Sequence, residues 1–300
     1  MSGVRAVAGF SRTVADLAVT EDFYRDALGF ERVAPPEPVP AAHVEAMGLA
    51  AVKARQLRLR LGRQTVTFVA VEPAGSPYPA DPLATDPFFQ HLAIPVRDIN
   101  AAMARLARCT PTTISRGGAQ VLPASTGGVT AYKFRDPDGH PLELIFFPDG
   151  PPAERWRDAP GLFLGIDHSA ITVADLDATL SFLTGPLGLT VAQKGVNRGP
   201  EQARLDGIDD PEVDVIALEP PVPAPHVELL HYRRPAPRHA SRTMFGPVDR
   251  ASTRFVFAIA DMGSLLAALR QAGFAPRASA DGRAAYCAGP DGHGFLFVKA

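Results

Sequence analysis

The stretch that decides the fold runs Tyr132-Lys133-Phe134-Arg135-Asp136-Pro137-Asp138-Gly139-His140-Pro141-Leu142-Glu143. Its Pro-Asp-Gly core suits a tight turn between two strands, and the apolar run that follows it is typical of a buried strand. Nearly the same turn recurs as Gly289-Pro290-Asp291-Gly292-His293, again before an apolar run. Two copies of one hairpin indicate that it belongs to a repeated unit.

An aspartate that follows a short apolar strand and opens a helix occurs four times in the chain. The four positions are Asp16, Asp98, Asp175 and Asp261. After Asp16 and Asp175 apolar residues recur at helical spacing. Runs rich in Val, Phe, Leu and Ile follow each helix and predict strands. The sequence therefore predicts four modules, each made of one strand, one helix and several further strands.

Length and proline-rich segments set the expected organisation. A module of about seventy residues is too small to bury a good core alone, so the modules are expected to pair. Proline-bearing segments at 73–79, 148–160 and 233–252 separate them. We predict an N-terminal domain at 1–150, with modules 1–75 and 86–148, and a C-terminal domain at 161–300, with modules 161–235 and 250–300.

Composition limits the classes of function. The formal net charge is −2 with interspersed signs, which disfavours a nucleic-acid partner. Two cysteines, Cys109 and Cys287, are too few for a disulfide framework or a thiolate zinc site. The start of the chain lacks the apolar stretch of a signal peptide, and no apolar run is long enough for a membrane span. We expect a cytoplasmic monomer or homodimer whose partner is a small-molecule substrate, with no nucleic acid and no membrane.

Taken together, these features resemble the vicinal oxygen chelate (VOC) superfamily, the glyoxalase, bleomycin resistance protein and extradiol dioxygenase group. The resemblance spans essentially the whole chain, and residues 131–143 are its most specific part. It implies an α+β fold in which four βαβββ modules pair into two cupped, mostly antiparallel sheets around a metal cavity. Members include glyoxalase I, ring-cleaving dioxygenases, fosfomycin-resistance enzymes and bleomycin-binding proteins, so the fold does not imply one reaction.

Counting from the helix-opening aspartates locates the ligand positions that the resemblance implies. Seven residues before each aspartate stand Gly9, His91, His168 and Arg254. At the matching place in the last strand of each module stand approximately Phe68, then Glu143, Glu228 and Leu296. Only the second and third modules supply imidazole and carboxylate groups. The predicted metal ligands are therefore His91, Glu143, His168 and Glu228.

The expected pairing of the modules follows from these four residues. Pairing in sequence order would leave His91 with Glu143 in one cavity and His168 with Glu228 in another, each too weak to hold a metal well. Pairing module two with three, and one with four, puts all four ligands in one cavity, an arrangement that resembles glyoxalase I. We favour this crossed pairing, within one chain or between two. The other cavity is then predicted to be metal-free and lined by Gly9, Phe68, Arg254 and Leu296.

A lone histidine on a strand is more often packed and hydrogen-bonded than bound to a metal, and a lone glutamate near a hairpin is usually solvated. Four residues at four expected positions favour a metal site, because an isolated carboxylate is costly to bury. His226 faces the same side as Glu228 and is predicted to support or substitute for a ligand. His140 and His293 are predicted to be surface turn residues. No role is assigned to His43, His231 and His239.

Two imidazoles and two carboxylates favour one divalent metal ion, for which Zn, Ni, Co, Mn and Fe are all suitable. Such a centre polarises a carbonyl or stabilises an enediolate while a glutamate moves a proton. The resemblance to glyoxalase-like members implies that Glu143 or Glu228 is the catalytic base, without ranking them. The main prediction is a metal-dependent VOC enzyme with lyase or isomerase chemistry on a small vicinal-oxygen substrate.

Two alternatives stay open. An Fe(II) extradiol ring-cleaving dioxygenase uses two histidines and one carboxylate, and the resemblance implies a tyrosine ten residues before the glutamate, where this chain has Lys133 and Leu218. A metal-free binding or sequestering protein of the resistance type would instead contain an apolar cleft. Four residues near the expected cavity rims are candidate substrate contacts, with ordinary solvated surface as the simpler interpretation: Arg12, Lys194, Asn197 and Arg198.

Overall fold

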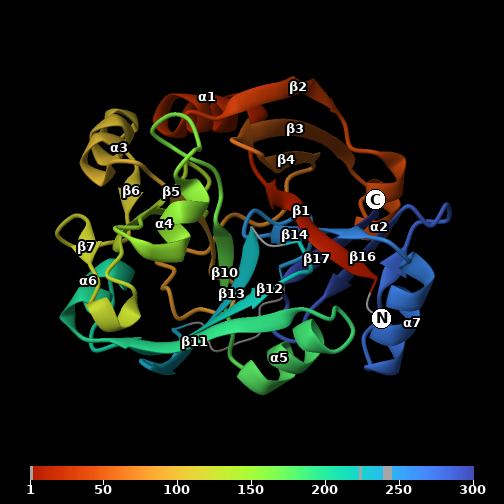
Figure 1. Ribbon diagram of the computed structural model, residues 1–300. Coiled ribbons are helices and arrows are strands. Elements are labelled where there is room, and N and C mark those ends of the chain that lie inside the picture. The colour runs from red at the N-terminus through yellow and green to blue at the C-terminus, as the bar shows by residue number, and fades with distance from the viewer. Residues whose placement is uncertain (1–2, 223–224, 239–244) are drawn as a thin grey trace.

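A computed structural model describes residues 3–222, 225–238 and 245–300 (Figure 1). His239 and part of the predicted linker at 233–252 lie outside this range. The helices are α1 (Leu17–Leu28), α2 (Ala41–Met47), α3 (Ile99–Leu106), α4 (Gly150–Trp156), α5 (Leu176–Thr184), α6 (Pro200–Asp206) and α7 (Met262–Gln271), with short 3₁₀ turns at Ala107–Cys109 and Ala124–Thr126.

The strands follow the four predicted modules. Modules one and two contain β1 (Val4–Thr13), β2 (Glu31–Pro38), β3 (Lys53–Leu61), β4 (Gln64–Glu72), β5 (Gln90–Pro95), β6 (Thr112–Thr113), β7 (Gln120–Val121), β8 (Thr130–Arg135) and β9 (Pro141–Phe146). Modules three and four contain β10 (His168–Thr172), β11 (Thr190–Arg198), β12 (Glu212–Glu219), β13 (His226–Arg234), β14 (Thr253–Ile259), β15 (Arg277–Ala278), β16 (Ala284–Ala288) and β17 (Gly294–Lys299).

Each module begins with a strand that ends just before an aspartate and a helix that starts after it. The carboxylates of Asp16, Asp98, Asp175 and Asp261 accept hydrogen bonds from backbone N–H groups in the first turns of α1, α3, α5 and α7. These N–H groups have no partner inside their helix, so the cap fixes where each helix starts. The repeat predicted from the four aspartates is confirmed.

The strands form two sheets, and each sheet combines modules from both halves of the sequence (Figure 1). One has the order β15-β16-β17-β14-β1-β4-β3-β2 and joins modules one and four. The other has the order β11-β12-β13-β10-β5-β9-β8-β6, with β7 paired to β8, and joins modules two and three. The predicted α+β fold and the crossed pairing are confirmed, and the crossing occurs within one chain. Division into domains at 1–150 and 161–300 stays a prediction.

Strand pairing inside and between modules follows one rule. The first strand of each module runs parallel to its last strand, as in β5 with β9 and β10 with β13. The two first strands of a sheet meet antiparallel at its centre, β1 against β14 and β5 against β10. The first and last strands of both modules are therefore neighbours in the middle of each sheet, where their side chains share one face.

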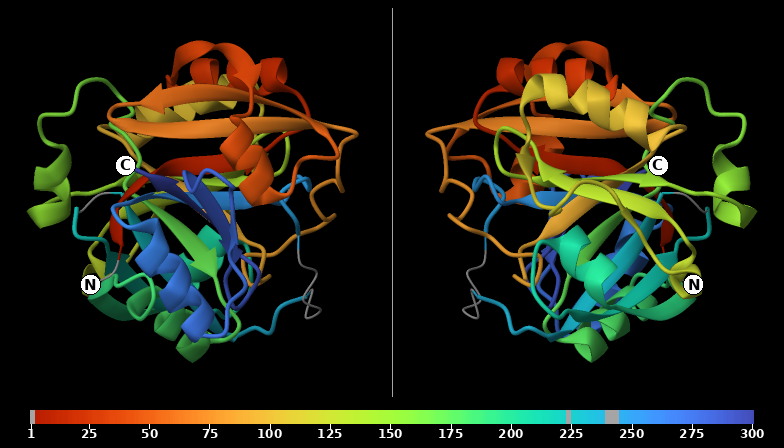
Figure 2. Two further views of the ribbon diagram at one scale, coloured as in Figure 1. Left: turned by 90° about the vertical axis from the view of Figure 1, so that its right-hand side faces the viewer. Right: turned by 90° about the vertical axis from the view of Figure 1, so that its left-hand side faces the viewer.

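Alternation along the central strands separates the core from the opposite face of each sheet. On β14, Phe255 and Phe257 are buried in the main hydrophobic core with apolar residues of α1, α3, α5 and α7, whereas Val256 belongs to a separate cluster. Figure 2 shows α1 above the long strands of module one and α7 against the strands of module four. Helices α1, α3, α5 and α7 thus pack on the core faces of the sheets. The opposite faces carry the candidate sites, with α2 beside one and the end of α6 beside the other.

The two Asp-Gly-His turns join neighbouring modules and are not at the surface. Nε2 of His140 lies 2.9 Å from the carbonyl oxygen of Thr13, and Nε2 of His293 lies 2.8 Å from that of Thr172. Both rings are buried. The prediction that they are surface turn residues was wrong, because each hairpin folds back onto the preceding module, whose first strand supplies a carbonyl acceptor.

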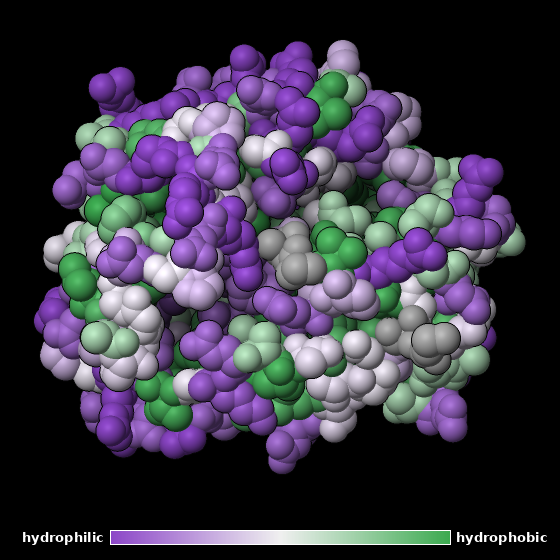
Figure 3. Space-filling model, in the orientation of Figure 1, coloured by the Kyte–Doolittle hydropathy of each residue, from purple (hydrophilic) through white to green (hydrophobic). Residues whose placement is uncertain are grey.

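The outer surface is mixed. Figure 3 shows hydrophilic residues interspersed with small apolar groups over the face in view. The large hydrophobic residues exposed in the described part of the chain are scattered valines, such as Val121 and Val222. No helix among the described residues has the length and apolar character needed to cross a membrane.

Candidate metal centre

The four predicted ligands lie on the same face of the sheet formed by modules two and three. Ala170 of β10 pairs with His91 on one side and with Glu228 on the other. Ala93 of β5 pairs in the same way with His168 and with Glu143. Directly paired residues project to the same face of a sheet. We call this face, with His91, Glu143, His168 and Glu228, the histidine cup.

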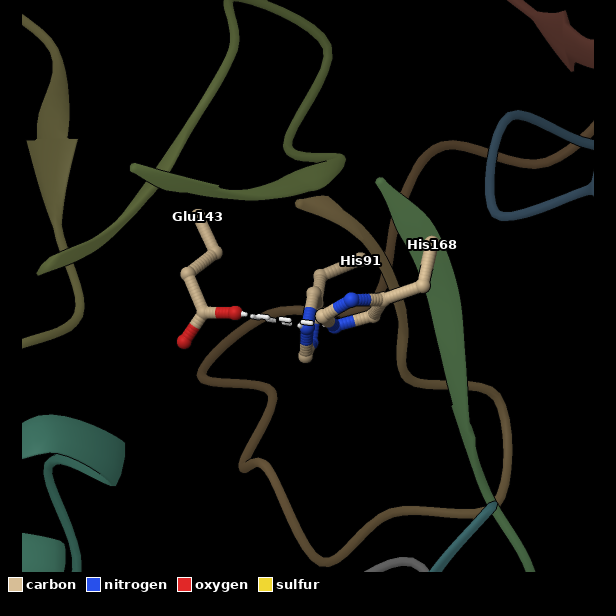
Figure 4. A group of neighbouring side chains, drawn as sticks. All are labelled: His91, Glu143 and His168. Atoms are coloured by element: carbon tan, nitrogen blue, oxygen red, sulfur yellow. Dashed lines mark ion pairs between the residues drawn. The ribbon is translucent and has the colours of Figure 1, made fainter. Parts of the chain in front are cut away.

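Three of these side chains converge closely (Figure 4). One potential ligand atom from each of His91, Glu143 and His168 lies within 4.8 Å of the other two. Oε2 of Glu143 is 3.2 Å from Nε2 of His91 and 3.9 Å from Nε2 of His168. Glu228 lies beside this group, with its Oε1 3.7 Å from Nε2 of His168. The geometry therefore brings together three predicted ligands and places the fourth next to them.

The converging atoms lack the partners that buried polar atoms normally have. Both ring nitrogens of His91 and Nε2 of His168 are buried without a hydrogen-bond partner in the described part of the chain. The contact between His91 and Glu143 is short, but it lacks hydrogen-bond geometry. A cation between them would satisfy all three side chains, so the donor set fits a divalent metal ion.

Electrostatics within the cup differ for each group. Burial lowers the pKa of His91 to about 4, so its imidazole is neutral at pH 7 and offers a lone pair. Burial raises the pKa of Glu143, but the His91 ring and the Lys133 ammonium lower it to about 2. Burial opposes a charge on His168, yet Glu228, Asp167 and Glu143 raise its pKa to about 9. A metal bound to His168 must therefore displace a proton.

Asp167 supports His168 from behind. Its Oδ2 lies 3.0 Å from Nδ1 of His168, and its Oδ1 accepts a hydrogen bond of 3.0 Å from the indole N–H of Trp156. His226 packs against the ring of His168, with ring centroids 5.1 Å apart. Asp167, His168 and His226 form a second group whose potential ligand atoms all lie within 4.8 Å of one another. The structure thus places His226 beside the site, as its position before Glu228 predicts.

A buried ion pair borders the cup and was missed by the sequence analysis. Nζ of Lys133 lies 2.7 Å from Oδ1 of Asp206, at the end of α6, and both side chains are almost completely inaccessible. Tyr232 and Gln202 donate hydrogen bonds to the other oxygen of Asp206. Lys133 pairs across β8 and β9 with Glu143. Alternation along β8 could have placed Lys133 in the cup, but nothing in the sequence links it to Asp206 in another module.

A protein-family model matches most of this chain. The model described as Glyoxalase/Bleomycin resistance protein/Dioxygenase superfamily matches residues 7–144 and 165–297. The chain belongs to this superfamily. The two matched ranges correspond to modules one and two and to modules three and four, so both halves carry the superfamily pattern.

Solved structures of other proteins share the fold. Glyoxalase I from Zea mays is 15% identical, with a TM-score of 0.62, and the match covers 98% of this chain and 92% of that chain. A putative dioxygenase from Bacillus subtilis is 14% identical, with a TM-score of 0.61 and coverage of 100% and 86%. The comparison with curated proteins gives no match. At these identities the likeness shows the fold alone.

The second sheet of this superfamily member has a different face. Arg254 and Leu296 lie on the side of β14 and β17 opposite the core, as predicted, and we call this face the arginine cup. The prediction that Phe68 lines it was wrong. β4 runs parallel to β1 with Thr67 beside Ser11, so Thr67 projects into the cup and Phe68 is buried in the core. The position counted from the sequence was one residue too far, and one residue reverses the face.

The four residues predicted to lie near the cavity rims have three different environments. Arg12 is fully buried and donates hydrogen bonds to Tyr24 and to the carbonyl oxygen of Pro141, so it does not line a rim. Lys194 and Arg198 are exposed on β11. Asn197 donates a hydrogen bond to Gln202, which also bonds to Asp206. Of the four residues, Asn197 is the one tied to the network beside the histidine cup.

Proposed function

We propose that this VOC superfamily member is a divalent-metal-dependent enzyme with glyoxalase-like lyase or isomerase chemistry on a small vicinal-oxygen substrate. The proposed metal ligands are His91, Glu143, His168 and Glu228. The observation that carries the proposal is the convergence of buried, unpartnered ring nitrogens from modules two and three on one carboxylate. Buried polar atoms without partners are rare in proteins and often mark a bound ion or a catalytic role.

The residues of the cup divide the work of the reaction. A bound divalent ion supplies Lewis acidity toward adjacent oxygens of the substrate. We assign Glu228 as the base, because its side chain is 18% exposed against 7% for Glu143. Glu228 takes the proton from the hydroxyl-bearing carbon next to the substrate carbonyl and returns it to the carbonyl carbon, while the hydroxyl proton passes to the carbonyl oxygen. Glu143, whose pKa is lowered to about 2, stays ionised and serves as a ligand.

The neighbours of the cup hold these groups in place. Asp167 holds Nδ1 of His168, so that Nε2 of that ring points toward Glu143. The Lys133 ammonium stabilises the charge of Glu143. Low accessibility of His91 and His168 keeps bulk water from the reacting atoms. Fixed charges in a water-poor site act more strongly than in solvent, which favours proton transfer between set positions.

A specific observation supports an Fe(II) ring-cleaving dioxygenase as the second candidate. Within the histidine cup, the side chains that converge most closely are two histidines and one carboxylate, His91, His168 and Glu143. Two histidines and one carboxylate are the ligand set of many non-haem Fe(II) oxygenases. Glu228 then stands off the metal. Lys133 and Leu218 stand where a tyrosine acid-base group is expected in such enzymes. His226, which lies beside His168, would supply that group instead.

Metal content and turnover of the purified protein separate these proposals. We expect one divalent ion per chain in the wild type and loss of most metal in His91→Ala. His231→Ala is the control and should keep its metal. His231 lies on the same strand as Glu228, but its ring pairs with Asp214. Glu228→Gln loses isomerase turnover under the first proposal. Full metal content in His91→Ala would refute the site.

Substrate tests complete the comparison. Under the first proposal the wild type converts hydroxyketones or hemithioacetals without consuming oxygen. Under the second it consumes oxygen with catechols and contains iron, and Glu228→Gln keeps its metal because that residue is not a ligand. Absence of stoichiometric metal in the wild type after growth with each candidate ion would favour a metal-free binding protein.

A further inference from the structure

The arginine cup contains a buried positive charge without a carboxylate partner. Arg254 is fully buried. It donates hydrogen bonds to the hydroxyls of Ser11, Thr13 and Ser252 and to the carbonyl oxygen of Pro247. Among the described residues no carboxylate forms an ion pair with it. Burial lowers the pKa of Arg254 only to about 10, so the guanidinium is charged at pH 7.

Neutral oxygens accept most of the hydrogen bonds of this guanidinium, but they do not balance its charge. A buried ion without an opposite charge is costly, and proteins usually pair it or bind a counter-ion. Nη2 of Arg254 bonds to Ser11 alone, so one of its two hydrogens has no acceptor in the described part of the chain. The arrangement therefore leaves attraction for an anion on the Ser11 side of the arginine.

Ser11 connects Arg254 to a cavity of about 300 Å³, counted with its open mouth. The walls include the hydroxyl residues Ser11 and Thr67 and the apolar residues Val39, Met47, Val69 and Leu296. Ser11 accepts two hydrogen bonds from Arg254, at 3.2 and 2.9 Å. Its own proton has no acceptor among the described residues. A buried donor polarised by a guanidinium thus borders empty space.

A second hydroxyl lies beside the first. Ser11 and Thr67 are direct neighbours in the parallel pairing of β1 and β4 and project to the same face. The described residues give the Thr67 hydroxyl no partner either. Two adjacent O–H donors match the two oxygens of a carboxylate, and bonds to an ionised acceptor are stronger than bonds between neutral groups.

We propose that the arginine cup binds a small aliphatic monocarboxylate, with its oxygens on the hydroxyls of Ser11 and Thr67 and its charge opposite Arg254. One guanidinium matches one negative charge. The apolar walls suit a short alkyl chain. Glu37 accepts a hydrogen bond from the cavity residue Gln56. Its carboxylate also forms an ion pair with Arg58, with 3.2 Å between Oε1 and Nη2, which offsets its repulsion of a bound anion.

This site is separate from the histidine cup, so it does not depend on the proposed metal chemistry. It lies on the sheet of modules one and four, whereas all four proposed metal ligands lie on the sheet of modules two and three. It adds a second small-molecule site to the same chain, in the module pair that lacks histidine and glutamate ligands.

Calorimetric titration of the whole protein with butanoate and with its neutral analogue butanamide tests the proposal. We expect saturable binding of butanoate and binding of butanamide weaker by about tenfold or more, as for loss of a charge-assisted hydrogen bond. Ser11→Ala and Thr67→Val each weaken butanoate binding by about tenfold. Thr65→Val is the matched control, because Thr65 has the same orientation on β4 but does not line the cavity.

The His91→Ala variant separates the two cups, since it should lose metal and keep butanoate binding. Circular dichroism of each variant checks that the fold is retained. Arg254→Met removes the positive charge from the proposed site. Arg254→Lys, which keeps a positive charge, takes its place if Arg254→Met fails to fold. The proposal is overturned if wild-type protein shows no saturable binding of butanoate, if butanamide binds equally well, or if a folded Ser11→Ala, Thr67→Val double variant binds as tightly as the wild type.

Discussion

Nδ1 of His168 lies 3.0 Å from Oδ2 of Asp167, the residue that precedes it in the chain. Asp167 is buried just before β10, and its other oxygen is held by the indole of Trp156. A carboxylate on one ring nitrogen fixes the tautomer and the orientation of the imidazole and leaves the other nitrogen for a metal. The direction of Nε2 of His168 toward Glu143 therefore depends on a residue outside the proposed ligand set.

Weakening this support should weaken metal binding. We expect Asp167→Asn to reduce metal affinity by about 10–100-fold, as for other residues that orient a ligating histidine. Competition with a chromophoric chelator measures the change. Asp214→Asn is the control, because Asp214 makes a similar contact of 3.0 Å to His231 away from the cup. Equal affinities of Asp167→Asn and wild type would contradict the role of Asp167.

Removal of the metal should be visible in tryptophan fluorescence. Trp156 is the single tryptophan of the chain, and it bonds to the carboxylate that holds His168. We expect the emission of Trp156 to change when a chelator is added to the metal-loaded protein and to return when metal is restored. The same titration of His168→Ala should give no change, because its metal site is broken. An unaltered wild-type emission would argue against a metal at His168.

The buried pair of Lys133 and Asp206 should contribute strongly to stability as a unit. Lys133→Met leaves the Asp206 carboxylate buried beside Tyr232 without its cation, which costs about 3–5 kcal/mol. The double variant Lys133→Met, Asp206→Leu removes both charges and should recover part of this loss. Urea unfolding gives the free energies. A double variant less stable than the single one would show that the pair stabilises by more than charge compensation.

The buried turn histidines should make the protein sensitive to acid. Burial lowers the pKa of His140 well below 6.5, with help from Arg12, and burial also lowers the pKa of His293. The unfolded chain takes up these protons as the pH falls through 6.5, whereas the folded chain does not. Stability from both rings is therefore full above pH 6.5 and decreases below it. Unfolding experiments from pH 7.5 to 5.0 should show a smaller decrease for His140→Gln with His293→Gln.

Local patterns explain what the sequence could predict. The capping aspartates fix the start of each helix through bonds to residues two or three positions away. A constant distance from these caps then places His91 and His168 at equivalent points of β5 and β10. Because the register of paired strands follows from that equivalence, the sequence alone predicts the convergence of these rings with Glu143.

The failures of prediction involve contacts between modules. Nothing near Lys133 in the sequence indicates that it meets Asp206, or that His140 meets the end of β1. Such contacts depend on how modules pack, which a strand pattern does not encode. The placement of Phe68 failed for a different reason. The hairpin between β3 and β4 sets the register of the last strand, and counting from Asp16 does not give the length of that hairpin.

Both ends of the described chain are hydrogen-bonded to the backbone at the point where β14 ends. Ala260 donates a hydrogen bond to the carbonyl oxygen of Gly3, and Ala300 donates one to that of Ile259. A bridge of roughly five residues could therefore connect Ala300 to Gly3, at about 3.3 Å per residue. If the chain were opened at Asp149 instead, every strand pair would be kept while the two halves exchanged their order. A circular permutant opened at that point should therefore assemble both cups unchanged.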